Sequence, residues 1–167
     1  GLLDAVVFSG GEPTLQAGLG EAMHQVKSLG FKIGLHTAGI YPGRLQAVLP
    51  LVDWIGMDIK STRAEYEATT GVRGSGARAW RSAELIVESG VACEFRTTLH
   101  PDMLSQEQLA ALATELSESG ATSYVIQKCN TGHCRDEAWR LVSQPAPERQ
   151  FFAQIAEKFD DFSLRNY

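Results

Sequence analysis

Short apolar runs alternate along the chain with segments in which apolar residues recur every three or four positions. The first pattern predicts buried β-strands and the second predicts amphipathic helices. Apolar runs predict strands at Asp4–Ser9, Phe31–His36, Asp53–Ile59, Val91–Leu99, Ala121–Lys128 and Phe162–Arg165. Helical spacing predicts helices at Gln16–Leu29, Pro42–Leu49, Arg78–Ser89, Ser105–Ser119 and Glu148–Phe159, with a helical turn at Arg63–Thr69. Two further segments are long enough to be lids or substrate loops, Gly71–Gly76 and Cys129–Pro147.

Glycines mark the ends of several predicted helices. Gly30, Gly90 and Gly120 each follow a helical segment, where glycine adopts the left-handed backbone that stops a helix. Ser105 and Gln108, three residues apart, form a capping box at the start of another helix. Strands that alternate with helices are typical of βαβ units. We therefore predict an α/β fold with a parallel sheet that is covered on its faces.

Polar and ionisable residues follow the predicted strands, at the edge where parallel sheets carry their chemistry. In chain order they are Ser9-Gly10-Gly11-Glu12, His36-Thr37, Asp58-Ile59-Lys60, Arg96-Thr97-Thr98 and Gln127-Lys128. The two glycines let a ligand approach the main chain closely. Because both acids and bases are present, we expect a zwitterionic ligand with an amine and a carboxylate.

Each of these residues also has a purely structural interpretation. Glu12 could be a turn residue, and Asp58 with Lys60 could form a solvated salt bridge of little consequence. Arg96 lies within an apolar and threonine-rich strand, so it needs a carboxylate partner from the protein or from a ligand. A histidine such as His36 is more often a core or surface residue than a catalyst.

Composition narrows the class of protein. The 167 residues are 44% hydrophobic and 21% charged, which is enough for one domain, residues 1–167, with a sizeable core. A net charge of −5 argues against binding to nucleic acid or to an anionic membrane. No apolar run approaches the roughly 18 residues of a transmembrane helix. The three cysteines fit a reducing cytoplasm better than a disulfide framework.

Several of these segments resemble the radical S-adenosylmethionine (radical SAM) enzymes. Gly10-Gly11-Glu12-Pro13-Thr14 resembles the second-strand motif that contacts the methionyl amino group of the cofactor. Asp53–Lys60 is similar to the fourth-strand segment of activating enzymes for glycyl-radical proteins, whose Asp and Lys line the site. The resemblance implies a cofactor-binding set of Gly10, Gly11, Glu12, Thr37, Asp58, Lys60 and Arg96, in which Arg96 meets the cofactor carboxylate.

The whole chain looks nearest to the activating proteins of anaerobic ribonucleoside-triphosphate reductases. That resemblance implies a partial (β/α) barrel of five to six parallel strands. It also implies reductive cleavage of S-adenosylmethionine to methionine and a 5′-deoxyadenosyl radical, which abstracts hydrogen from a glycine of the partner enzyme. The implied partners are a glycyl-radical enzyme and an electron donor such as flavodoxin or ferredoxin. No residue of the set needs to act as a general acid or base.

The cysteines depart from the family pattern. The family holds a [4Fe–4S] cluster through Cys-x-x-x-Cys-x-x-Cys, whereas Cys93, Cys129 and Cys134 do not form this motif. We interpret Cys93 as a small buried hydrophobic residue. Cys129, His133 and Cys134 match no standard zinc pattern, so we favour a plain loop and predict no metal ligand in this chain.

The start of the chain suggests a piece of a longer protein. Gly1-Leu2-Leu3 runs directly into a strand, whereas domains usually begin with an exposed segment. By the family layout, we expect the cluster motif and the first βα unit upstream of Asp4. We therefore expect the chain alone to be inactive, to bind S-adenosylmethionine weakly at best, and to self-associate through an exposed strand edge.

Two other functions fit the same residues. A radical SAM enzyme that acts on a small molecule, such as a deazapurine synthase, would use Glu12 and Arg96 with a different substrate loop. A non-catalytic (β/α) module would only dock a partner protein.

Overall fold

A computed structural model of the protein describes residues 3–100, 102–133 and 145–166. The strands within these residues form one sheet of six in the order β1-β2-β3-β4-β5-β6, and every neighbouring pair is parallel. The strands are β1 Ala5–Phe8, β2 Lys32–Thr37, β3 Trp54–Asp58, β4 Ala92–Leu99, β5 Ser123–Lys128 and β6 Asp161–Arg165. The first and last strands do not pair, so the predicted α/β class and the partial parallel barrel are confirmed.

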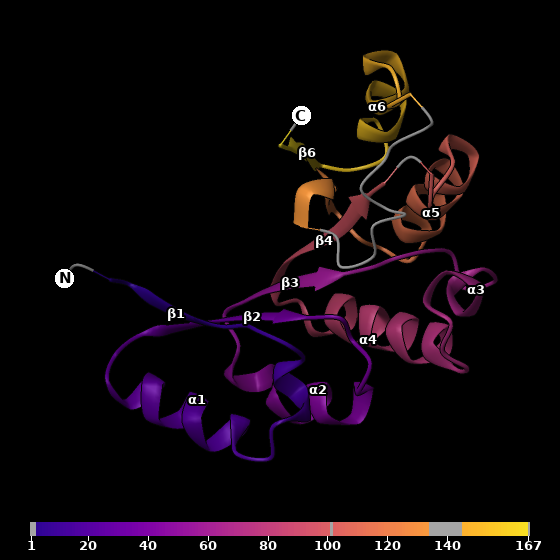
Figure 1. Cartoon of the computed structure of the whole chain (residues 1–167). Coiled ribbons are helices and arrows are strands. Elements are labelled where there is room, and N and C mark those ends of the chain that lie inside the picture. Colours follow the sequence, from indigo (N-terminus) through magenta and orange to yellow (C-terminus); the bar gives the residue numbers. More distant parts are fainter. Residues whose placement is uncertain (1–2, 101, 134–144, 167) are drawn as a thin grey trace.

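Helices connect the strands. The α-helices are α1 Leu19–Ser28, α2 Pro42–Val48, α3 Tyr66–Thr70, α4 Ser75–Ser89, α5 Gln106–Glu118 and α6 Arg149–Ala156. Short 3₁₀ helices lie at η1 Pro13–Leu15, η2 Leu49–Leu51 and η3 Thr131–His133. Figure 1 shows α1, α2 and α4 together on one side of β1, β2 and β3. No helix in the described part of the chain is both long and apolar enough to cross a membrane.

The core lies between the sheet and the helices. Side chains from both layers are fully buried there. The sheet contributes alternate strand residues, including Leu35, Ile55, Met57, Phe95 and Ile126, and the helices contribute Met23, Leu45, Trp80, Ile86 and Leu112. Their neighbours along each strand point to the opposite face. The sequence predicted a sheet covered on its faces, but over β1 this is wrong, since Val7 in this edge strand is 48% exposed.

The start of helix α4 differs from the prediction because a glycine packs closely there. Helix α4 begins at Ser75, inside the predicted Gly71–Gly76 loop. A Cβ at Gly76 would lie 2.8 Å from the Cβ of Tyr66, so this glycine allows α4 to contact α3. Gly74, just before the helix, has a positive φ of 72°. The cluster of glycines therefore marks a tight helix–helix contact.

The other predicted loop, Cys129–Pro147, is described only in part. Cys134 lies outside the described residues.

Candidate functional site

The carboxyl ends of the strands form one rim, and a cavity of about 370 Å³ opens there. Its walls come from the ends of β3, β4 and β5 and from α3. The lining residues are Asp58, Ile59, Lys60, Thr69, Thr70, Arg96, Thr98, His100, Met103, Leu104 and Cys129. The predicted residues Asp58, Lys60 and Arg96 are therefore brought together in one pocket. Its polar floor and its apolar wall from Met103 and Leu104 suit a ligand with a charged end and an apolar end.

The glycine loop after β1 presents bare backbone to the outside. Gly10 and Gly11 have positive φ angles of 91° and 55°, a conformation that side chains other than glycine rarely adopt. A Cβ at either position would meet no atom within 4 Å, and both residues are exposed. The loop therefore needs glycine for its conformation, and its main chain remains open to a ligand.

Glu12 ties this loop to the end of β2. Its Oε1 accepts hydrogen bonds from the Thr14 backbone N–H at 3.1 Å and from the Thr14 and Thr37 hydroxyls. Its Oε2 accepts one from the Ala38 backbone N–H at 2.8 Å. The carboxylate also caps the 3₁₀ helix η1. Glu12 therefore has a structural role at this turn, as its position in the sequence suggested.

A binding role for Glu12 is still compatible with these contacts. A carboxylate has about four lone-pair sites, and Oε2 uses only one acceptor position within the described residues. Thr37 is buried, donates to Glu12 and accepts from the Gly39 backbone N–H at 3.0 Å. Its hydroxyl is therefore occupied by the chain itself, and Thr37 acts on the site through Glu12.

Arg96 is held by the protein on three sides. Its Nε donates to Asp58 Oδ1 at 3.1 Å and its Nη2 donates to the Gly56 carbonyl at 3.3 Å. Its Nη1 lies 3.3 Å from His36 Nε2. The side chain is only 11% exposed, against 41% for Asp58. The carboxylate partner that the sequence required for Arg96 is Asp58, its register neighbour on β3.

A glycine lets this arginine lie flat on the sheet. Arg96 reaches from β4 across Gly56 on β3 toward His36 on β2, since His36 and Gly56 are register partners. A Cβ at Gly56 would lie 3.0 Å from Arg96 Cζ and 2.9 Å from a ring carbon of Trp54. The sequence analysis did not select Gly56, although a glycine inside an apolar strand signals a close approach.

His36 lies at the centre of these contacts. Its Nδ1 is 3.3 Å from the Ser9 hydroxyl at the end of β1, and its ring packs edge-on against Trp54 with centroids 5.5 Å apart. Burial and the nearby Arg96 guanidinium lower the pKa of His36 below 6.5, against the opposing charges of Asp58 and Glu94. The imidazole is therefore neutral at neutral pH, and it is a residue of the site that the sequence analysis left unassigned.

Lys60 and Gln127 complete the rim. Lys60 is exposed, and its ammonium group makes no ion pair with any residue that the structure describes. Gln127 Nε2 donates to the Thr98 hydroxyl at 2.7 Å, which joins the ends of β4 and β5. Lys60 thus adds an uncompensated positive charge to the rim, beside the Asp58–Arg96 pair.

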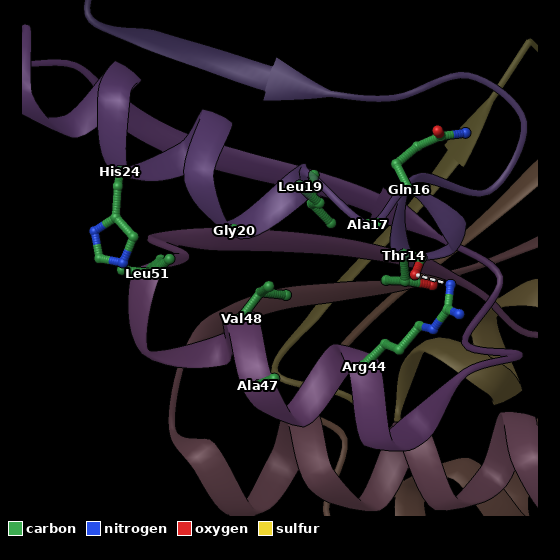
Figure 2. A pocket seen from close by; sticks show the side chains of 10 residues that line it. All are labelled: Thr14, Gln16, Ala17, Leu19, Gly20, His24, Arg44, Ala47, Val48 and Leu51. Atoms are coloured by element: carbon green, nitrogen blue, oxygen red, sulfur yellow. Dashed lines mark hydrogen bonds between the residues drawn. The ribbon is translucent and has the colours of Figure 1, made fainter.

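A second cavity, of about 390 Å³, lies between α1 and α2. Figure 2 shows Arg44 reaching from α2 toward Thr14, with His24 at the far end. Arg44 Nη1 donates to the backbone carbonyls of Leu15 at 2.6 Å and Thr14 at 3.4 Å. Thr14 therefore contacts Glu12 with its side chain and Arg44 with its backbone. This cavity contains none of the predicted site residues, and Arg44 binds the backbone of the 3₁₀ helix η1 that follows Glu12.

The cysteines of the described residues do not form a cluster site. Cys93 lies on β4 and packs against the hydrophobic core, while Cys129 follows β5 at the rim. Burial raises the pKa of the Cys93 thiol, which disfavours the thiolate that a metal requires. Within the described residues, no three His, Cys, Asp or Glu side chains are grouped to hold a metal ion. These residues therefore do not fit a [4Fe–4S] cluster.

Fold and site together define a parallel α/β protein with a charged ligand pocket at the carboxyl edge of a partial barrel. The sequence profile of the radical SAM superfamily matches residues 1–113. The chain belongs to the radical SAM superfamily.

Individual relatives agree with this assignment. A protein of Methanocaldococcus jannaschii named as a glycyl-radical enzyme activating enzyme is 27% identical over 166 residues, 95% of this chain and 68% of that protein. A 7-carboxy-7-deazaguanine synthase of Thermococcus kodakarensis is 36% identical over 91 residues, 54% of this chain and only 35% of that protein. The fold is similar to a domain of pyruvate-formate lyase-activating enzyme from Bacteroides vulgatus, with a TM-score of 0.70 at 14% identity over 96% of this chain and 98% of that chain.

Proposed function

We propose that this chain is the S-adenosylmethionine-binding part of an activating enzyme that generates a glycyl radical on a partner enzyme of the anaerobic ribonucleotide reductase type. The observation that carries the proposal is the convergence of Asp58, Lys60 and Arg96 in one rim pocket, next to a strand end that presents Gly10, Gly11 and Glu12. The activating-enzyme relative, which aligns with 95% of the chain, supports the same function.

The donor set of the rim fits the methionine part of the cofactor. A guanidinium has five N–H groups, and Arg96 uses three of them in the contacts described above. The two remaining N–H groups, one on each terminal nitrogen, are available for a carboxylate in a charge-assisted contact. We assign the ammonium group to the second oxygen of Glu12 and to the open backbone of Gly10 and Gly11. Asp58 and Lys60 complete the pocket.

When bound, S-adenosylmethionine supplies the 5′-deoxyadenosyl radical that removes a hydrogen atom from the substrate. The residues of this chain bind and orient the cofactor, and none of them transfers a proton. The described residues do not fit the cluster that donates the electron, so we derive no step through it. We propose that these 167 residues alone are inactive, and that flavodoxin or ferredoxin supplies the electron in the working enzyme.

Electron paramagnetic resonance of the partner enzyme tests this function. The protein is reconstituted anaerobically with iron and sulfide in its full natural length and mixed with S-adenosylmethionine, a one-electron reductant and an anaerobic ribonucleotide reductase. We expect a glycyl radical on the reductase and release of 5′-deoxyadenosine. Arg96→Lys keeps the charge but loses the fork geometry, and it should lower both signals together. Release of 5′-deoxyadenosine without a protein radical would contradict the proposed partner.

The deazaguanine synthase relative favours a second function, a radical reaction on a small heterocycle. Both functions require the same rim, so cofactor binding does not separate them. Formation of a deazapurine product with no radical on the reductase would identify this second function. A protein that yields neither product nor 5′-deoxyadenosine would be a docking module.

A further inference from the structure

A continuous series of hydrogen bonds links residues on or just after β1, β2, β3 and β4, toward the carboxyl ends of these strands. Ser9 follows β1, His36 lies on β2, Asp58 on β3 and Arg96 on β4. The contacts run from the Ser9 hydroxyl to His36 Nδ1, from His36 Nε2 to Arg96 Nη1, and from Arg96 Nε to Asp58 Oδ1. The proposed function uses Arg96 but assigns nothing to His36 or Ser9.

Hydrogen-bond chemistry determines which nitrogen of His36 carries the proton. A guanidinium can only donate, so His36 Nε2 must accept from Arg96 Nη1 at 3.3 Å and has no hydrogen. The proton of the neutral ring is then on Nδ1, which donates to the Ser9 hydroxyl at 3.3 Å. Protonation of Nε2 would place a second donor and a second positive charge against the guanidinium. The contact therefore exists only while His36 is neutral.

The surroundings leave Arg96 as the main charge that His36 meets. Asp58 on β3 is bound to Arg96, so its negative charge is partly offset. Glu94 on β4 and Arg165 on β6 also act on His36, with opposite signs. These two form a bidentate pair with N–O distances of 2.9 and 2.8 Å, so their charges largely cancel at the imidazole. From β1 and β3, Ser9 and Trp54 contribute only uncharged groups.

We infer that His36 is the positioning residue of the rim: its neutral imidazole fixes the Arg96 guanidinium across β3, and protonation of His36 releases it. The guanidinium then keeps Asp58 and the Gly56 carbonyl as partners but loses the contact that holds its Nη1 nitrogen. The two N–H groups assigned to the ligand carboxylate then lose their fixed direction. That last consequence rests on the proposed function, whereas the His36–Arg96 contact does not.

Two variants separate positioning from packing. His36→Gln places an amide oxygen near the position of Nε2 and cannot be protonated in this pH range. His36→Phe keeps a ring against Trp54 and removes the acceptor. Heteronuclear NMR of the chain without ligand reads the His36 tautomer and the Arg96 Nη1–H signal, which is protected only while His36 Nε2 accepts from this nitrogen. Titration with S-adenosylmethionine, followed by chemical shifts, reads the ligand contact.

We expect the wild-type chain to show His36 protonated on Nδ1 and a protected Arg96 Nη1–H above pH 6.5, and to lose that protection as the pH falls through the lowered pKa of His36. His36→Gln should keep the protection at both ends of the pH range, and His36→Phe should lack it at all pH values. Binding of S-adenosylmethionine should weaken by about tenfold in His36→Phe, the size of one hydrogen bond to a charged group, and should be restored in His36→Gln.

Three outcomes overturn the inference. They are a His36 that is protonated on Nε2, an Arg96 signal unchanged in His36→Phe, or an acid loss of that signal that persists in His36→Gln. The last comparison decides the matter even where His36→Phe does not fold. Failure of the wild-type chain to bind S-adenosylmethionine at any concentration would count against the proposed function, while the Arg96 signal would still decide the inference.

Discussion

The guanidinium of Arg96 lies directly over the α-carbon of Gly56. A Cβ at Gly56 would come within 3.0 Å of Arg96 Cζ and 3.1 Å of its Nη1, both shorter than ordinary side-chain contacts. The Gly56 carbonyl also accepts a hydrogen bond from Arg96 Nη2 at 3.3 Å. One residue without a side chain therefore provides both the space and an acceptor for the arginine that crosses the sheet.

Gly56→Ala should displace Arg96 from this position. The added methyl group must push aside either the guanidinium or the Trp54 ring, and overpacking of this kind costs about 1–3 kcal/mol of the free energy of unfolding. We also expect weaker binding of S-adenosylmethionine. NMR titration measures the binding, and urea unfolding measures the stability. Gly43→Ala is the control, because a Cβ there meets no atom within 4 Å and the position lies in α2. Equal effects of the two substitutions would contradict the close packing at Gly56.

Glu12→Gln should destabilise the chain even without a ligand. Both carboxylate oxygens of Glu12 accept hydrogen bonds. A glutamine would have to place its NH₂ group against the donors of either Oε1 or Oε2. We expect a loss of about 1–3 kcal/mol in the free energy of unfolding, the cost of an unsatisfied group. Glu118→Gln, at an exposed position on α5, should change it by less than about 0.5 kcal/mol. If both variants unfold like the wild type, the hydrogen bonds of Glu12 to the end of β2 do not stabilise the fold.

The sequence predicted the strands and their order along the chain because apolar runs and glycine stops are local signals. The contacts within the site are not local. Glu12 bonds Ala38, 26 residues away, and Arg96 contacts His36 across 60 residues. The pattern could show that Arg96 needed a carboxylate, but only the register of β3 and β4 identifies Asp58 as its partner. Gly56 could have been found from the sequence, since glycine is costly inside a strand unless something lies over it.

Cys93 should resist thiol reagents in the folded chain. Burial raises the pKa of its thiol, and the thiolate is the reactive form, so alkylation should be slow in the native state and fast in urea. Mass spectrometry of the peptide that contains Cys93 measures the two rates. Cys93→Ala should lower stability by about 1 kcal/mol through lost packing and leave S-adenosylmethionine binding unchanged. Alkylation at equal rates in both states would contradict the partly buried position of Cys93 against the core.

The free energy of unfolding should decrease as the pH is lowered through the range in which His36 takes up a proton. Its pKa in the folded state lies below the ordinary value of 6.5, because burial and Arg96 disfavour the imidazolium. Above pH 6.5 the ring is neutral in both states and its contribution is fully present. As the pH falls from there through the lowered folded pKa, the unfolded chain takes up the proton first, so this contribution is lost. Urea unfolding of the wild type and of His36→Gln measures it, since subtraction removes the contributions of the other titratable groups. The free energy of unfolding of the wild type, relative to that of His36→Gln, should be constant above pH 6.5 and should decrease at lower pH. A difference that stays constant down to acid pH would mean that His36 has the same pKa in the folded and unfolded chains.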